Sequence, residues 1–247
     1  MHEIPVIRRT SQQLKKPLSN RSRTSSEDWF VKGAPPPPTP AIDALIKRTK
    51  RPSRLGLPKI IGIASSTGGP PVVERIIRHL PADYPVPIML VQHLSKGFSQ
   101  ALVSWLNEHT ALNVKEISHG DKALPGTVHV ASGQHHVRLE PGLHFSLMSR
   151  SLYNGHCPSA NVMFESLAKV CGEQSVGIIL TGMGDDGSNG LLMLKETGAM
   201  TYAQDEASCV ISSMPKEAVK KGAVCARLTP EEIADALLEL ASEKKNK

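Results

Sequence analysis

Short apolar runs alternate with helix-like segments along most of the chain. Residues 59–64, 87–91 and 176–180 are such runs, and each is followed by polar residues or glycine, as buried strands of parallel sheets are. Residues 72–80 and 97–109 repeat their apolar positions at helical spacing. Because strands that alternate with helices build parallel sheets, the pattern predicts an α/β fold: a doubly wound, mostly parallel sheet with helices on both faces.

The pattern changes between residues 114 and 148. Four strand-like segments, VKEI, TVHVA, HVRLE and HFSLM, follow one another there, separated by Pro-Gly or Gly turns. We therefore expect an antiparallel β-hairpin insert at the edge of the sheet. After it, the α/β pattern returns, with a helical segment at 162–171 and strands at 200–203 and 224–228.

The last helix has the clearest start signal. Thr229 fits the N-cap and Pro230 the first helical position, and Glu232 stands three residues after the cap, which is the capping-box spacing. We expect the globular part to end near residue 240, which leaves a charged tail at 241–247.

Residues 1–58 differ from the rest in composition. They hold 12 Lys/Arg and 4 Asp/Glu, a net charge of +8, whereas the remaining 17 Lys/Arg and 19 Asp/Glu give −2. They are rich in Ser and Pro with few apolar residues, and such segments bury too little surface to offset the cost of ordering. We predict a linker at 1–58 and a globular domain at 59–240. A tail that binds an acidic partner is the alternative for 1–58.

Several classes of protein fit the composition poorly. A nearly neutral globular part argues against a nucleic-acid-binding core. The four cysteines form no C-x-x-C pair and show no metal-ligand spacing with histidine, which favours a reducing compartment. No stretch approaches the roughly 20 apolar residues of a membrane span, and the N-terminus lacks the apolar segment of a secretory signal. The sequence is therefore interpreted as that of a cytoplasmic protein.

Polar clusters follow three of the predicted strands. They are Ser65 to Gly69, Gln92-His93, and Thr181 to Gly187. Ligands of open parallel sheets bind outside the carboxyl ends of the strands, so a hydroxyl, an imidazole and a carboxylate can converge there. Such a set activates a serine, because histidine takes its proton and the carboxylate orients the histidine. A helix that begins after the serine turn would also offer backbone N–H groups to an oxyanion.

Spacing alone leaves two interpretations open. One is the Ser-His-Asp triad, and the other is a phosphate or small-molecule site in the serine-glycine turn. The dinucleotide and Walker motifs are absent. The turn is also not the G-x-S-x-G elbow of α/β-hydrolases, because Ala64 stands two residues before Ser66, and the order Ser, His, Asp differs from theirs.

Longer strings resemble a known family. Within about residues 59–240, the chain resembles the catalytic domain of the chemotaxis protein-glutamate methylesterases of the CheB type. The strings that carry the resemblance are IGIASSTGGP, VQHLSKGF, CPSANVMFESLA, GIILTGMGDDGSNG and QDEASCVISSMPKEA. The resemblance implies a cofactor-free and metal-free serine esterase that hydrolyses glutamate γ-methyl esters on the cytoplasmic helices of methyl-accepting chemotaxis receptors. It also implies glutamine deamidation as a second activity.

The resemblance assigns roles to individual residues. Ser66 would be the nucleophile, His93 the general base and Asp186 the carboxylate that orients His93. It places four further residues in the substrate-binding pocket: Thr67, Met183, Gly184 and His136. Ser65 and Asp185 are the weaker candidates for the nucleophile and the acid. The other histidines of this region are expected at surface or strand positions: His119, His129, His135, His144 and His156.

The chain also departs from the family's pattern. The usual G-A-S-T-G-G reads A-S-S-T-G-G, and R-P-S reads Cys157-Pro158-Ser159 without the arginine. Residues 1–58 show none of the signals of the N-terminal receiver domain that typical members carry. We therefore expect a domain that is uninhibited in cis, or one regulated by a separate receiver or signalling protein. The alternatives are a non-catalytic module that binds receptor or partner helices, and an esterase acting on a non-chemotaxis methylated protein.

Overall fold

The computed structural model describes residues 56–95, 97–148 and 155–242. The predicted linker therefore lies almost entirely outside the described residues, as does most of the charged C-terminal tail. The division into linker, domain and tail stays a prediction.

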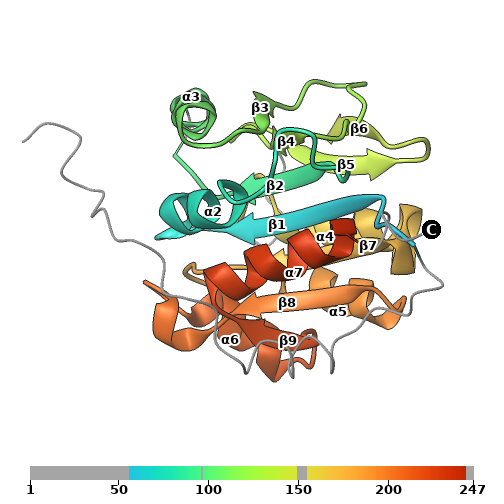
Figure 1. Ribbon diagram of the computed structural model, residues 1–247. Helices are drawn as coiled ribbons and strands as arrows, with labels where there is room; N and C mark the ends of the chain where they lie inside the picture. Colours follow the sequence, from blue (N-terminus) through green and yellow to red (C-terminus); the bar gives the residue numbers. More distant parts are fainter. Residues whose placement is uncertain (1–55, 96, 149–154, 243–247) are drawn as a thin grey trace, which may run out of the picture. The chain divides into compact units, whose positions relative to one another are not determined.

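A seven-stranded sheet forms the centre of the described chain (Figure 1). Its strand order is β3-β4-β2-β1-β7-β8-β9, and every neighbouring pair is parallel. The strands are β1 (Ile60–Ser65), β2 (Ile88–Gln92), β3 (Asn113–Glu116), β4 (Thr127–Val130), β7 (Ser175–Ile179), β8 (Met200–Gln204) and β9 (Ala226–Leu228). Because the chain starts in the middle and winds first to one side and then to the other, the predicted doubly wound sheet is confirmed.

Helices cover both faces of the sheet, as predicted. One face packs on α2 (Gly69–Ile77), α3 (Ser99–His109) and α7 (Pro230–Ser242); the other packs on α4 (Ala160–Val170), α5 (Ser188–Glu196) and α6 (Ser213–Lys220). The described residues also include two short 3-10 helices, η3 (Gly172–Gln174) and η4 (Glu206–Ser208). Neighbouring residues of β1 alternate between the two cores, since Ile61 and Ile63 join one and Ile60 and Ala64 the other. The continuous apolar runs of the sequence follow from burial on both sides.

The predicted antiparallel β-hairpin insert is confirmed, but it is smaller than the sequence pattern predicts. Among the described strands, β5 (His136–Glu140) and β6 (His144–Met148) are the antiparallel pair; they form a separate two-stranded sheet, and β5 packs against α4. The segments VKEI and TVHVA are β3 and β4 of the parallel sheet instead. Strand-like residues and glycine turns do not encode the direction of pairing, and this is why the prediction was wrong for residues 114–130.

The last helix begins as predicted. The Thr229 amide donates to Glu232 at 2.8 Å, and the Glu232 amide donates to Thr229 Oγ1 at 3.2 Å, which is a complete capping box. Within the residues that are described, no helix is both long and apolar enough to cross a lipid bilayer.

A histidine is buried in the sheet next to the hairpin. His129 lies on β4 with no exposed surface, its Nε2 accepts from the Leu124 amide at 3.0 Å, and its ring packs on Phe145. Its Nδ1 has no hydrogen-bond partner among the described residues. Burial, together with the nearby positive charge of Lys115, lowers the pKa of His129 to about 4. His129 is therefore held neutral inside the fold.

Replacing His129 by glutamine is expected to weaken the acid sensitivity of folding. The folded pKa is about 4 and the unfolded value is 6.5, so the unfolded chain binds the proton first as the pH falls. This stabilisation is complete above pH 6.5 and is lost toward pH 4, at up to about 1.4 kcal/mol per pH unit. Urea unfolding at several pH values measures the slope, with exposed His144→Gln as the control. Equal slopes in wild type and His129→Gln would contradict this prediction.

Candidate active site at the strand ends

The ends of β1, β2 and β7 bring the three predicted polar clusters together. Ser65 and Gln92 are paired residues at the ends of β1 and β2, so Ser66 and His93 are the next positions on each strand. Because side chains alternate along strands, Ser66 and His93 are directed to the same side of the sheet, opposite to Ser65 and Gln92. The Ser66 amide also donates to the Thr181 carbonyl, which follows β7, at 3.0 Å.

Gln92 forms hydrogen bonds with both the serine turn and His93. Its side-chain Nε2 donates to the carbonyls of Ser66 and His93, both at 2.9 Å, and its Oε1 accepts from Ser65 Oγ at 2.6 Å. Ser65 is completely buried, and its hydroxyl is used in this contact, whereas Ser66 is partly exposed. Of the two neighbouring serines, Ser66 is thus the one whose position suits a nucleophile.

The helix after the serine turn offers fewer free donors than the sequence suggests. The first amide of α2, that of Gly69, donates to the Ser66 carbonyl at 2.9 Å. The next two residues are Pro70 and Pro71, which have no N–H. Gly68, at φ 78°, turns the chain tightly into the helix. The first three positions of α2 therefore offer no free N–H group to an oxyanion. The candidates for this role are instead the amides of the turn itself.

Asp186 is buried at the N-terminus of α4. Its carboxylate accepts five hydrogen bonds: from His93 Nε2 (2.9 Å), the Ala160 amide (2.6 Å), Ser159 Oγ (2.7 Å), the Asn161 amide (3.2 Å) and Asn161 Nδ2 (3.0 Å). A carboxylate in this place satisfies the unpaired amides of the helix end and the positive end of its dipole. Asp185, by contrast, is exposed. The geometry thus distinguishes the two acids.

The ionisation of Asp186 determines the tautomer of His93. Burial alone would raise the pKa of the Asp186 carboxyl, but the hydrogen bonds from His93, the Ala160 amide and Ser159 outweigh it, and the net shift is downward. An ionised carboxylate only accepts hydrogen bonds. When the His93 ring is neutral, its proton therefore sits on Nε2, and Nδ1 carries the lone pair.

The other nitrogen of His93 is the one available for chemistry. His93 Nδ1 is buried and has no hydrogen-bond partner among the described residues. Of the two ring nitrogens, Nε2 is occupied by Asp186, so a base reaction with Ser66 has to use Nδ1. This is the reverse of the triad in which Nδ1 faces the carboxylate and Nε2 the serine.

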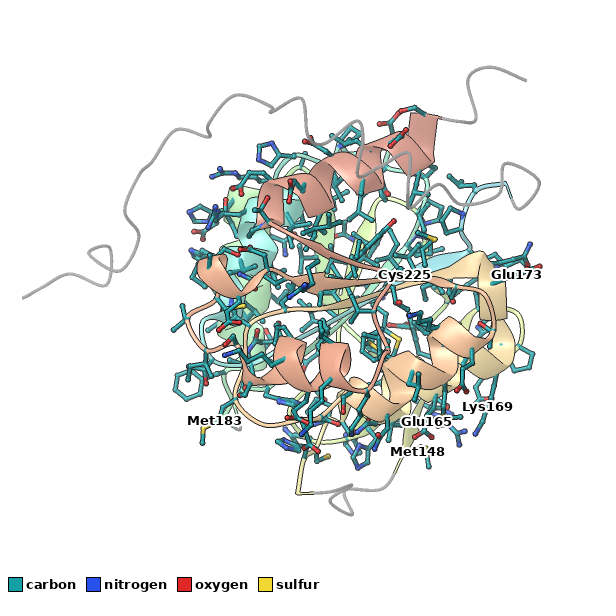
Figure 2. All side chains as sticks on the ribbon, turned by 90° about the horizontal axis from the view of Figure 1, so that it is seen from below. Met148, Glu165, Lys169, Glu173, Met183 and Cys225 are labelled. Atoms are coloured by element: carbon teal, nitrogen blue, oxygen red, sulfur yellow. The ribbon has the colours of Figure 1, made fainter. Side chains whose placement is uncertain are left out.

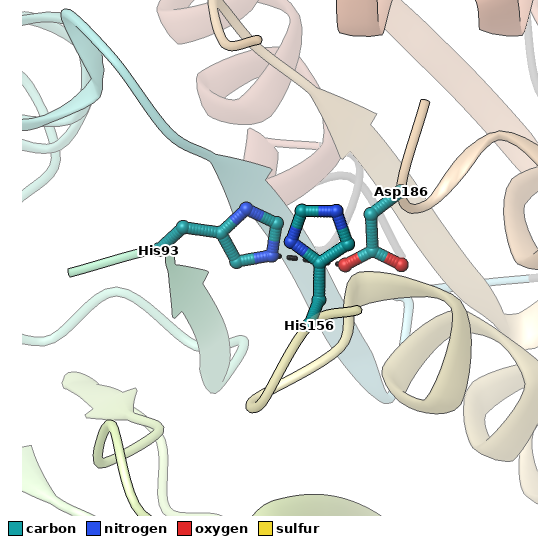
Figure 3. A group of neighbouring side chains, drawn as sticks. All are labelled: His93, His156 and Asp186. Atoms are coloured by element: carbon teal, nitrogen blue, oxygen red, sulfur yellow. Dashed lines mark hydrogen bonds and ion pairs between the residues drawn. The ribbon is translucent and has the colours of Figure 1, made fainter. Parts of the chain in front are cut away.

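A second histidine lies on the first. The ring of His156 stacks on that of His93 with centroids 4.6 Å apart and an interplanar angle of 13° (Figure 3). His93, His156 and Asp186 have ligand atoms within 4.8 Å of one another, and these residue types bind zinc. An imidazole binds a metal in its own plane, however, and nearly parallel planes do not converge on one ion. As they lie, the rings are arranged for stacking.

The four predicted pocket residues lie in two different places. Thr67, Met183 and Gly184 are exposed on the loops beside the strand ends. Figure 2 shows the Met183 side chain at the periphery of the fold, and 68% of this residue is exposed. His136 is buried on β5, where its Nδ1 accepts from the Ser159 amide at 3.2 Å. It thus stands behind the residues that hold Asp186, and the pocket role of all four stays a prediction.

Sequence reasoning missed part of the site. It did not assign Ser159 and Asn161 to Asp186, although a serine just before a helical pattern is an N-cap signal. The predicted helix began at 162, two residues after the observed start, so the cap was out of view. His156 was grouped with surface or strand histidines, and no local signal marks its contact with His93.

Comparison with known families identifies the fold. The model of the CheB methylesterase family matches residues 61–237. The chain belongs to the CheB methylesterase family. The solved structure of the Thermotoga maritima CheB methylesterase catalytic domain is similar, with a TM-score of 0.72 at 34% sequence identity, covering 74% of this chain and 98% of that one.

Curated relatives agree with this membership. The protein-glutamate methylesterase/protein-glutamine glutaminase 4 of Geobacter metallireducens is 42% identical over 194 residues, which cover 78% of this chain and 55% of the relative. The protein-glutamate methylesterase/protein-glutamine glutaminase 2 of Pseudomonas aeruginosa is 41% identical, and the match covers 77% of this chain and 55% of the relative. The Escherichia coli K12 protein is 37% identical, covering 73% and 52%. The chain thus spans about half the length of the curated relatives it matches.

Proposed function

We propose that this CheB-family chain is a protein-glutamate methylesterase with Ser66, His93 and Asp186 as its catalytic residues. The observation that supports this most directly is the His93–Asp186 pair at 2.9 Å, beside the Ser66 turn. The carboxylate is held ionised by its donors, and one ring nitrogen of His93 is left without a partner among the described residues. A serine base requires this arrangement.

The acylation step follows from these positions. Ser66 Oγ attacks the carbonyl carbon of a glutamate γ-methyl ester while His93 Nδ1 takes the hydroxyl proton. Asp186 stabilises the imidazolium, because its carboxylate already binds Nε2–H. The tetrahedral intermediate then collapses, the C–O bond to the methoxy group breaks, and His93 returns the proton so that methanol leaves. An acyl ester of Ser66 remains.

Water completes the cycle by the same route. His93 Nδ1 takes a proton from water, the hydroxide attacks the acyl carbon, and Ser66 leaves with the proton that His93 returns. The products are the free Ser66 hydroxyl and a glutamic acid side chain, which releases its proton to solvent and becomes a carboxylate. An amide can enter the same acylation step with ammonia as the leaving group, and the names of the relatives include protein-glutamine glutaminase. Glutamine deamidation is therefore the second activity that we propose.

The proposed substrates are the methylated glutamates on the cytoplasmic helices of methyl-accepting chemotaxis receptors. Family membership supports this choice. Thr67, Met183 and Gly184, exposed beside the triad, are the proposed contacts for the substrate. Regulation by a separate receiver or signalling protein belongs to the same proposal.

Covalent labelling separates an esterase from a non-catalytic binding module. The full chain is treated with a fluorophosphonate, and the labelled peptide is identified by mass spectrometry. We expect one label, on Ser66, together with methanol release from receptor that carries methyl-labelled glutamates. Binding to receptor helices without either signal would favour the binding module. Labelling without methanol release from receptor would keep the esterase and move its substrate to another methylated protein.

A further inference from the structure

One hydrogen bond does not fix the ring of the proposed base. His93 is held through Nε2 by Asp186, whereas its Nδ1 has no partner among the described residues. The torsion that turns an imidazole about its bond to Cβ has a broad energy profile, so a contact at one atom leaves the tilt of the ring free. A base has to aim its lone pair at the hydroxyl within narrow limits. Some other contact has to set the plane of His93.

His156 provides a contact of this kind. Its ring is stacked nearly parallel to that of His93 and displaced sideways from it (Figure 3), at a centroid distance of 4.6 Å and an interplanar angle of 13°. A stacked ring opposes tilting because tilting would separate the two faces or bring their atoms too close. Both histidines are partly buried, so the contact lies at the edge of the site and not in the core.

The same short segment also holds the carboxylate. His156 is followed by Ser159, Ala160 and Asn161, which donate four of the five hydrogen bonds to Asp186. Residues 156–161 thus contact both members of the His93–Asp186 pair, at the face of the ring and at the carboxylate. The ring and its orienting acid are therefore placed relative to each other by one piece of chain.

We infer that His156 is a positioning residue, whose stacked ring sets the plane of His93 so that Nδ1 is directed at the Ser66 hydroxyl. The inference rests on the proposed function for the hydroxyl that Nδ1 meets. The stacked contact itself does not depend on it. The role requires a flat ring at position 156. It does not depend on the ring nitrogens, because the contact is made by the faces of the rings. This separates it from a second base or a metal ligand, both of which require the nitrogens.

A set of substitutions tests this inference. His156→Ala is expected to lower kcat for methanol release by about 10- to 100-fold with KM changed less than about twofold, as small misplacements of catalytic groups do. His156→Phe keeps a flat ring and is expected to restore kcat to within about threefold of wild type. His109→Ala is the matched control, because His109 packs on Trp105 of α3 and makes no contact with the triad.

NMR of the imidazole groups, recorded on protein labelled with ¹⁵N-histidine, gives a readout that does not depend on activity. Wild type and His156→Phe are expected to show one narrow set of His93 signals with the proton on Nε2, whereas His156→Ala broadens or doubles them. If His156→Ala does not fold, His156→Gln fills the place without a ring and is expected to show the same loss of kcat.

Three results would overturn the inference: an unchanged kcat in His156→Ala, a His156→Phe variant as impaired as His156→Ala, or identical His93 signals in all variants. Failure of the proposed function is recognised separately. In that case Ser66→Ala retains methanol release, while the His93 signals still respond to the ring at position 156.

Discussion

Replacing Ser66 by alanine is expected to lower the rate of methanol release by about 10⁴-fold or more, since removal of a triad nucleophile leaves only binding and oxyanion stabilisation. The fold is expected to persist. The hydrogen bonds of Ser66 that tie the turn to Gln92, Gly69 and Thr181 are made by its backbone, and alanine keeps them. Methanol release from methyl-labelled receptor is the activity measurement, and circular dichroism with thermal unfolding checks the fold.

Ser65→Ala is the matched control for this experiment. Ser65 differs from Ser66 in that its hydroxyl is buried and donates to Gln92 at 2.6 Å. Removing it is expected to cost about 1 kcal/mol of unfolding free energy, because Gln92 loses one partner. Activity should then fall only modestly, through a looser Gln92 contact with the turn. A Ser65→Ala enzyme as inactive as Ser66→Ala, or an active Ser66→Ala enzyme, would contradict the assignment.

The parts of this fold that were predictable are those written in local sequence. The buried strands are continuous apolar runs, and Thr229 and Glu232 form the capping signal at the start of the last helix. The strands and this helix start can therefore be predicted without tertiary information. The positions of Ser66 and His93 follow from the strands, because polar residues after parallel strands meet at one edge of the sheet. The choice of Ser66 over Ser65 came from the family resemblance. A physical argument for the same prediction, the buried contact of Ser65 with Gln92, is visible only in the structure.

The parts that were not predictable depend on contacts distant in sequence. The cap that Asp186 forms on α4 joins positions 25 to 27 residues apart, and the N-cap signal of Ser159 does not say which distant residue it contacts. His156 and His93 belong to different segments, and a stacked contact has no sequence pattern. The direction of β3 was missed for the same reason, since its partner is decided by the path of the chain. Apart from the start of α4, which the prediction placed two residues too late, the missed features lie in tertiary packing.

The cap gives Asp186 two roles that a single substitution affects together. As the proposed acid of the triad it accepts the hydrogen bond from His93 Nε2, and as an N-terminal anion of α4 it accepts from Ser159, Ala160 and Asn161. Burial raises the pKa of Asp186, but the hydrogen bond from His93, followed by those from the Ala160 amide and Ser159, lowers it overall, so these contacts together stabilise the fold at pH values above the unfolded value of 3.8. That stability is lost as the pH falls through the lower folded pKa. The contribution of Asp186 to the stability of the fold and that of the buried, neutral His129 are thus lost in different ranges of acid pH.

Asp186→Asn is expected to lower methanol release by about 10⁴-fold, because the amide no longer stabilises the Nε2–H tautomer or the imidazolium of His93. It is also expected to lower the unfolding free energy by about 2–4 kcal/mol, since an amide nitrogen now faces buried donors that the carboxylate oxygen accepted from. Urea unfolding and methanol release measure the two effects, with exposed Asp185→Asn expected close to wild type in both. Full activity in Asp186→Asn would remove this residue from the triad. Unchanged stability would show that the α4 cap does not depend on its charge.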